Sequence, residues 1–256
     1  CHVHAGDYAD LAGCGLIIIA AGANQKPGET RTELLGRNRI ILSSIIEQIM
    51  QVDRDAVLLI VSNPVDVLTC MAHKLSGLPA GRVIGSGTVL DTARLKYLLG
   101  QRLGVDSRNV HAFIIGEHGD SELAVWSSAN ISGVDLDDYC RITGIVQPAA
   151  VLHEIYENVR DAAYSIIEGK GATYYGIGMA VRRIVEAIVR DEHSVLPVSS
   201  MISGHYGVEG ICLGLPSIVG RGGAEAVLDI PLSEEELTRL QSSARKMQEL
   251  IDEVGG

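Results

Sequence analysis

The feature that most constrains the fold of this chain is a repeated pairing of a short apolar run with a longer helical pattern. Residues 16–22 are aliphatic and end in glycine, which is typical of a strand buried on both faces of a parallel sheet. Residues 56–61 form a second such run, and residues 82–84 form a third that leads into a Gly-Ser-Gly turn. Because helical patterns and short connections separate the runs, the sequence predicts βαβ units and a doubly wound α/β sheet.

Capping residues mark where the intervening helices begin. Thr30 and Glu33 have the spacing of a capping box, and apolar side chains then recur at helical spacing for several turns. Asn63 and Pro64 suit the start of a second helix, which we expect to end near Gly77. The pattern thus predicts a helix at both connections between the parallel strands.

The pattern changes after Gly87, where we place the boundary between two domains. The elements expected next are a helix over 88–103, a strand over 111–115, and long helices over 150–168 and 173–191. Residues 194–230 combine strand-like runs with Gly-rich turns, which indicates an antiparallel sheet. Ser233 and Glu236 again have capping-box spacing and predict one further helix.

Charge and cysteine content limit the classes of partner. The 256 residues carry a net charge of -11 and contain no basic run, which argues against nucleic acid and anionic membranes as partners. The five cysteines are scattered, so we expect neither a disulfide framework nor a structural metal site, and we place the protein in a reducing cytoplasm. The longest apolar run near the start is too short to span a bilayer.

Three titratable side chains are candidates for chemistry. His118 lies in a Gly-flanked turn after an expected strand, a position that suits a reactive group, although an isolated histidine is more often structural. Asp91 and Arg94 are three residues apart, so they share one face of a helix. They could form a simple surface ion pair. Alternatively, Arg94 binds a substrate carboxylate through its planar fork while Asp91 orients His118 and favours its protonated form.

Two polar loops follow the expected carboxyl ends of the first two strands, where α/β sheets bind ligands. Residues 22–31 carry two glycines and a proline, as a closing lid or an ordinary connection would. Asn63 either caps its helix or presents its amide to a bound oxygen. Each of these signals has an unremarkable structural explanation when taken alone.

Taken in order, five motifs resemble the bacterial L-lactate dehydrogenases of the lactate/malate dehydrogenase superfamily. The motifs are Gly-Ala-Asn-Gln-Lys-Pro-Gly-Glu-Thr-Arg, Asn-Pro-Val-Asp, Gly-Ser-Gly-Thr-Val-Leu-Asp-Thr-Ala-Arg, Gly-Glu-His-Gly-Asp and Lys-Gly-Ala-Thr-Tyr-Tyr-Gly. The resemblance extends from residue 6 to the last expected helix. It implies reversible, NAD-dependent hydride transfer between L-lactate and pyruvate, in a homotetramer.

The resemblance also implies an α/β fold in two parts. Residues 1–87 would be a partial Rossmann-type parallel sheet whose first βαβ unit is missing. Residues 88–256 would be an α+β substrate-binding and catalytic domain with an antiparallel sheet. No Gly-x-Gly-x-x-Gly turn occurs in the sequence, and that turn normally holds the pyrophosphate of NAD. We therefore expect these residues alone to bind NAD weakly and to show little activity.

The resemblance assigns the catalytic and substrate-binding roles. His118 would be the acid/base, and Asp91 would hold its ring. Arg94 would bind the substrate carboxylate, and Arg31, on a mobile loop, would polarise the carbonyl. Further residues at the substrate would be Gln25, Asn63 and Thr173. Malate dehydrogenases of the superfamily carry arginine at the position of Gln25, and an uncharged residue there favours lactate over malate because a second carboxylate would lack a counter-charge.

The resemblance extends to the cofactor and to a regulator. The positions implied to contact NAD are Tyr8, Gly22, Ala23, Ser44, Val61, Ser62, Asn63 and Ser86. Lys96 and His111 match positions that bind the activator fructose 1,6-bisphosphate in many bacterial relatives, although arginine is usual at the first. Three alternatives stay open: a dehydrogenase of larger 2-hydroxy acids, one of malate, or a truncated homologue without catalytic activity.

Overall fold

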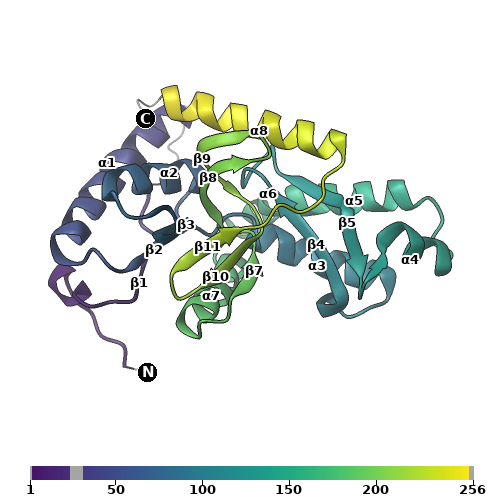
Figure 1. Cartoon of the computed structure of the whole chain (residues 1–256), viewed down its shortest axis with the longest axis horizontal. Coiled ribbons are helices and arrows are strands. Elements are labelled where there is room, and N and C mark those ends of the chain that lie inside the picture. Colours follow the sequence, from purple (N-terminus) through teal and green to yellow (C-terminus); the bar gives the residue numbers. More distant parts are fainter. Residues whose placement is uncertain (1, 24–30, 254–256) are drawn as a thin grey trace.

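The first sheet contains three parallel strands, as the sequence predicts. The structure, a computed structural model, describes residues 2–23 and 31–253, apart from the side chains of residues 31 and 32. The strands are β1 (Leu16–Ile19), β2 (Val57–Ile60) and β3 (Val83–Gly85), and the helices between them are α1 (Arg31–Val52) and α2 (Val65–Ser76). In Figure 1 this region forms the left half of the molecule.

Strand β2 is buried on both faces of this sheet. Leu58 and Ile60 belong to the core that also contains side chains of α1 and α2. Val57 and Leu59 belong to a separate core with α7 (Tyr175–Val189). The unbroken aliphatic run therefore reflects two packed faces, as expected for a central parallel strand.

Two strands from late in the chain extend the first sheet. Strand β8 (Ser199–His205) pairs antiparallel with β3, and β9 (Val208–Gly214) pairs with β8, which gives the order β1-β2-β3-β8-β9. A smaller antiparallel sheet consists of β7 (Ser194–Leu196), β10 (Ser217–Gly220) and β11 (Gly223–Val227). The expected antiparallel strands are present, and one sheet joins residues from both sides of Gly87.

The other half of the molecule, at the right in Figure 1, has its own core. It contains α3 (Val89–Leu103), β4 (Val110–Ile115), β5 (Leu123–Ile131), β6 (Val134–Asp135), α4 (Leu136–Ile142) and α5 (Pro148–Arg160). Helix α8 (Glu234–Glu253) runs along the top of Figure 1 and contacts α2, β5 and β9, so it bridges the two halves. Its predicted capping box is present, because Ser233 and Glu236 exchange two hydrogen bonds.

Two details of the predicted helices are wrong. The helix expected over 150–168 is two helices, α5 and α6 (Ala162–Lys170), which meet at Asp161. The Asp161 carboxylate binds the Arg160 guanidinium at this junction. Asn63 does not cap α2: Pro64 occupies the cap position, without a side-chain cap bond, and the Asn63 carbonyl instead accepts a hydrogen bond from Asn38.

None of the helices in the described part of the chain combines the length and apolar character that crossing a bilayer requires.

Candidate functional site

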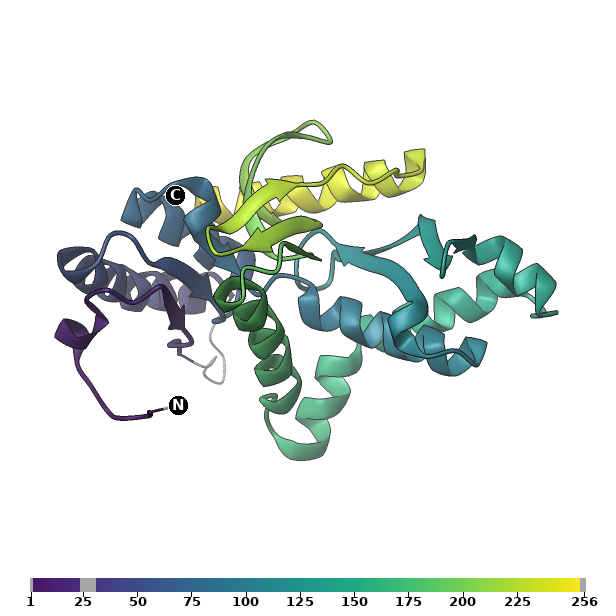
Figure 2. The same ribbon diagram turned by 60° about the horizontal axis from the view of Figure 1, so that its bottom comes forward.

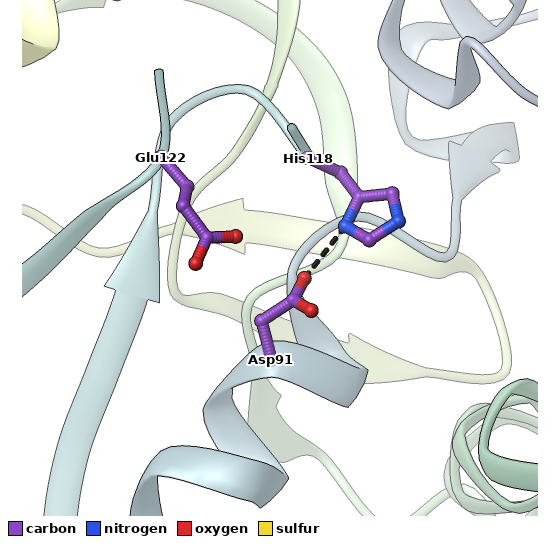
Figure 3. A group of neighbouring side chains, drawn as sticks. All are labelled: Asp91, His118 and Glu122. Atoms are coloured by element: carbon purple, nitrogen blue, oxygen red, sulfur yellow. Dashed lines mark hydrogen bonds and ion pairs between the residues drawn. The ribbon is translucent and has the colours of Figure 1, made fainter. Parts of the chain in front are cut away.

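The imidazole of His118 is held by a buried carboxylate on a different element. His118 lies in the turn between β4 and β5, and its Nδ1 is 2.6 Å from Oδ2 of Asp91 on α3. Asp91 is 2% exposed, whereas 26% of the His118 side chain is exposed. Figure 3 shows the Asp91 carboxylate at Nδ1 and the second ring nitrogen pointing away from it. The ring is thus fixed at one nitrogen and open to a ligand at the other.

The same carboxylate also contacts Arg94. Nη1 of Arg94 lies 3.3 Å from Oδ1 of Asp91, and 20% of the arginine side chain is exposed. The i,i+3 ion pair considered from spacing therefore exists, but Asp91 also binds His118. Because both groups bind one carboxylate, the imidazole and the guanidinium lie at a common site. A ligand could accept hydrogen bonds from both.

The charge of Asp91 controls the protonation of His118. Burial by itself lowers the pKa of His118, but the hydrogen bond and the charge of Asp91 outweigh burial and raise the pKa to about 9, with a further contribution from Asp66. The imidazolium form is therefore favoured at neutral pH. A group of this kind can donate a proton to a developing alkoxide.

Asp66 on α2 fixes the backbone of the histidine turn, and the sequence analysis gave it no role. Its Oδ2 accepts a 2.8 Å hydrogen bond from the backbone N–H of His118. Asp66 is 1% exposed, and burial raises its pKa to about 6. Asp66 was quoted in the Asn-Pro-Val-Asp motif, but nothing in local spacing links it to a residue 52 positions later.

Glu122, immediately before β5, is a third carboxyl group at this site that the sequence analysis missed. Its side chain points toward Asp91 and His118 in Figure 3, and ligand atoms of the three residues lie within 4.8 Å of one another. The described residues contain one other set that could approach a metal ion, the exposed Asp191, His193 and Glu225. In the buried set the Nδ1 atom of His118 already bonds Asp91, which favours proton transfer over metal binding.

A second network lies at the carboxyl ends of β1 and β2. The buried side chain of Asn38 accepts a hydrogen bond from the backbone N–H of Ala23 and donates one to the carbonyl of Asn63. Ser62 Oγ donates to the carbonyl of Ala21 at 2.5 Å. These bonds join the two loops that follow adjacent parallel strands. Asn38 was not predicted, although a polar residue on the apolar face of α1 was a usable signal.

Residues predicted at the cofactor lie partly at these strand ends. Val61, Ser62 and Asn63 follow β2, and the buried Ser86 follows β3. At Gly22 an added Cβ would lie 3.4 Å from the Ser62 side chain, so a larger residue would crowd this edge. A flat group can approach such an edge closely. The residues present thus fit the part of NAD that lies over the strand ends.

The other predicted cofactor residues are more dispersed. Tyr8, in a short 3-10 helix, packs against the first core. Ser44 is exposed midway along α1, where it accepts a hydrogen bond from Gln48. Among the described residues, no hydrogen bond joins Tyr8 or Ser44 to the strand ends.

The structure describes some of the predicted substrate residues but not others. Thr173 is exposed in the connection between α6 and α7, which Figure 2 shows at the lower end of the two helices. Farther along this segment, an added Cβ at Gly176 would lie 3.8 Å from Nη2 of Arg94, so the start of α7 borders the site. Gln25 lies outside the described residues. Arg31 begins α1, but its side chain also lies outside them.

The predicted regulator residues share one face of the β4–α3 layer. His111 and Phe113 are alternate residues of β4, and Lys96 Nζ lies 5.8 Å from the centre of the Phe113 ring. Burial lowers the pKa of Lys96, and His111 is exposed. A cation and an imidazole are thus available on this face.

Comparison with known proteins agrees with this geometry. Residues 1–85 match the NAD binding domain of lactate/malate dehydrogenases, and residues 88–255 match the alpha/beta C-terminal domain of the same family. The chain is 53% identical to an L-lactate dehydrogenase of Thermoanaerobacter sp. (strain X514), over 98% of this chain and 81% of that protein. It is 49% identical to L-lactate dehydrogenase 1 of Clostridium acetobutylicum, over 98% of this chain and 80% of the relative.

Solved structures give the same result. A lactate dehydrogenase from a Medee basin deep-sea metagenome library superposes with a TM-score of 0.95 at 46% identity, covering 98% of this chain and 80% of that one. The ligand-bound minor L-lactate dehydrogenase of Enterococcus mundtii superposes with a TM-score of 0.93 at 41% identity, covering 96% and 78%. The predicted fold class and family are therefore confirmed, and the chain belongs to the lactate/malate dehydrogenase family.

Proposed function

We propose that this chain interconverts L-lactate and pyruvate with NAD, and that His118, Asp91 and Arg94 are the residues at the reacting substrate. One observation carries the assignment of roles: a single buried carboxylate binds both the imidazole and the guanidinium. The site therefore offers a proton donor and a carboxylate anchor side by side. A 2-keto acid has a carbonyl next to a carboxylate and needs both.

His118 transfers the proton. In pyruvate reduction its second ring nitrogen donates a proton to the carbonyl oxygen, and in lactate oxidation the same nitrogen accepts the hydroxyl proton. Asp91 accepts the hydrogen bond of Nδ1–H, which keeps the ring in one orientation and stabilises the imidazolium form. The backbone bond from Asp66 fixes the turn, so the ring does not drift from its partner.

Arg94 anchors the substrate carboxylate. A guanidinium has five N–H donors in a planar fork, and the contact with Asp91 engages Nη1. The remaining donors can form two parallel bonds to a carboxylate, which lysine cannot do. The contact with Asp91 also limits the positions that the fork can adopt. Thr173 and Asn63 would line the space around the substrate.

NAD, when bound, supplies the hydride acceptor for lactate oxidation, and its reduced form supplies the hydride for pyruvate reduction. Val61, Ser62, Asn63 and Ser86 would hold it against the carboxyl ends of β2 and β3. Gly22 and Ala23 would border the same edge. Arg31, at the start of α1, would polarise the substrate carbonyl.

Substrate choice would depend on Gln25. An amide at this position gives no counter-charge for the second carboxylate of oxaloacetate, and an unpaired buried charge costs several kcal/mol. Steady-state NADH oxidation with pyruvate, oxaloacetate and branched 2-keto acids tests the proposal. We expect pyruvate to give the highest kcat/KM. A higher value with oxaloacetate or with a branched 2-keto acid would assign another member of the family.

Regulation and assembly extend the proposal. Fructose 1,6-bisphosphate would place a phosphate near Lys96 and His111, and the half-buried Lys96 has no carboxylate within ion-pair distance among the described residues. A homotetramer would cover the exposed apolar side chains of Tyr175 and Met179 on α7. The four cysteines in the described part of the chain are free thiols.

A further inference from the structure

Glu122 is a buried carboxyl group that the proposed reaction does not use. The residue is 3% exposed, and its Oε1 has no hydrogen-bond partner among the residues that the structure describes. A buried polar atom without a partner is uncommon in proteins and is costly to keep. Its placement beside a catalytic histidine therefore calls for a functional explanation.

The carboxyl group of Glu122 faces the His118–Asp91 pair. Its nearest oxygen lies within 4.8 Å of ligand atoms of both residues, and in Figure 3 its side chain points toward them. The element that carries it is fixed, because the Glu122 carbonyl accepts a 2.6 Å hydrogen bond from the hydroxyl of Tyr156. The carboxyl group is thus held near the imidazole without bonding to it.

Charged and titratable groups reach Glu122 from several elements. They are Asp91 and Arg94 on α3, His118 in the histidine turn, and Tyr156 and Arg160 on α5, with Arg239 on α8 beyond Tyr156 and Asp66 on α2 behind His118. Burial, and then the charge of Asp91, raise the pKa of Glu122 to about 8. Glu122 is therefore mostly protonated at neutral pH and ionises in the alkaline range in which His118 also loses its proton.

We propose that Glu122 is a positioning residue for the catalytic pair: once ionised, its carboxylate adds a second negative charge beside the His118 imidazolium and delays the loss of its proton. Two negative groups near one imidazolium stabilise it more than one does. A cavity of about 660 Å³ between α5 and α8 has Glu122 among its lining residues. The proton donor would thus stay charged at alkaline pH.

This inference rests on the proposed function only for the effect of Glu122 on the pH dependence of pyruvate reduction. In pyruvate reduction, activity falls at alkaline pH when His118 loses its proton. Glu122→Gln keeps the shape of the side chain but cannot ionise. We expect the alkaline limb of kcat/KM for pyruvate to move down by about one pH unit in this variant. Activity near pH 6.5, where Glu122 is uncharged, should change less than threefold.

A second readout does not require turnover. Diethyl pyrocarbonate acylates neutral imidazole, so the pH dependence of its initial rate at His118, followed by peptide mass spectrometry, reports the protonation of that ring. The exposed His193 in the same digest serves as an internal reference. The midpoint at His118 should fall by about one pH unit in Glu122→Gln and stay fixed at His193. If the chain does not turn over pyruvate but the acylation midpoint at His118 still shifts in Glu122→Gln, the proposed function is wrong and the role of Glu122 stands.

Two further variants complete the test. Glu235→Gln removes an exposed charge from the wall of the same cavity and should leave both profiles unchanged. Glu122→Asp keeps a charge one methylene farther away and should shift the His118 midpoint by less than half as much. Unchanged His118 midpoints in both Glu122 variants would overturn the proposal. So would an equal shift in Glu235→Gln, because the effect would then follow overall charge. Should Glu122→Gln not fold, the shift in Glu122→Asp decides.

Discussion

The His118 site and the Lys96 face both contain a cationic side chain and a histidine, but they differ in what surrounds the charges. At the first, Asp91 is 2% exposed and binds both His118 and Arg94. At the second, Lys96 contacts the ring of Phe113, and His111 is exposed. Asp91 compensates the charges of the His118 site, whereas no carboxylate among the described residues lies within ion-pair distance of Lys96.

This difference indicates which of the two sites is organised before a ligand binds. A buried carboxylate between two cationic groups fixes their positions before any ligand arrives, and such pre-organisation favours proton transfer. A half-buried lysine without a carboxylate partner in the described part of the chain instead suits an anion supplied from outside. Changes at the first site should therefore reduce catalysis strongly, and changes at the second should alter the response to an effector.

The largest effect is expected from His118→Gln. This variant keeps a polar side chain but cannot hold the transferable proton, and general acid–base catalysis contributes about 10²- to 10⁴-fold. We expect kcat/KM for pyruvate to fall about 10³-fold, measured by NADH oxidation. A loss smaller than tenfold would mean that the proton comes from another group. The His118 site would then matter little more for catalysis than the Lys96 face.

Arg94→Lys should have the next largest effect. Lysine keeps the charge but loses the planar fork, so one charge-assisted hydrogen bond to the substrate is lost, at a cost of about 1.5–3 kcal/mol. Pyruvate KM should rise roughly 10- to 100-fold, while the His118 protonation measured by diethyl pyrocarbonate stays close to wild type. An unchanged KM would place the substrate carboxylate elsewhere.

Stability should depend on pH through His118. The folded state raises its pKa from 6.5 to about 9, so the folded protein binds the proton more tightly than the unfolded chain. The resulting stabilisation is fully present below pH 6.5 and is lost as pH rises through 9, with an upper limit of about 3 kcal/mol. In urea unfolding, the stability difference between wild type and His118→Gln should shrink over this interval. A constant difference would contradict a charged, paired histidine.

The smallest effect is expected at the Lys96 face. Lys96→Gln should reduce the ratio of activity with and without fructose 1,6-bisphosphate by several-fold, because a half-buried contact between a lysine and a phosphate contributes about 1 kcal/mol. Arg108→Gln, an exposed arginine paired with Asp106, is a matched control and should preserve the ratio. If both variants respond alike, the effector does not bind at this face.

The sequence predicted the elements that depend on local patterns. Strands β1 and β2 and the capping box at Ser233 can each be predicted from residues close together in the sequence. All three are present. The break at Asp161 was missed because an aspartate is tolerated within a helix, and no proline or glycine marked the position. The addition of β8 and β9 beside β3 was also missed, since strand order across a sheet is not a local property.

The site shows the same division. Spacing suggested Asp91 and Arg94, the Gly-flanked turn suggested His118, and the motif resemblance assigned their roles. Asp66 and Glu122 were missed because they meet the histidine only through the fold: Asp66 comes from another helix, and Glu122 from the residue just before β5. Buried carboxylates of this kind have no sequence period, so only a structure brings them to the histidine.

In the proposed mechanism, Asp91 joins proton transfer and substrate anchoring at one site. The most direct test is kcat/KM for pyruvate across pH 6–10 in Asp91→Asn. We predict a loss of at least about 10²-fold at neutral pH and an alkaline limb displaced to lower pH, because the imidazolium loses its principal counter-charge. A profile within threefold of wild type, with the same alkaline limb, would contradict the account.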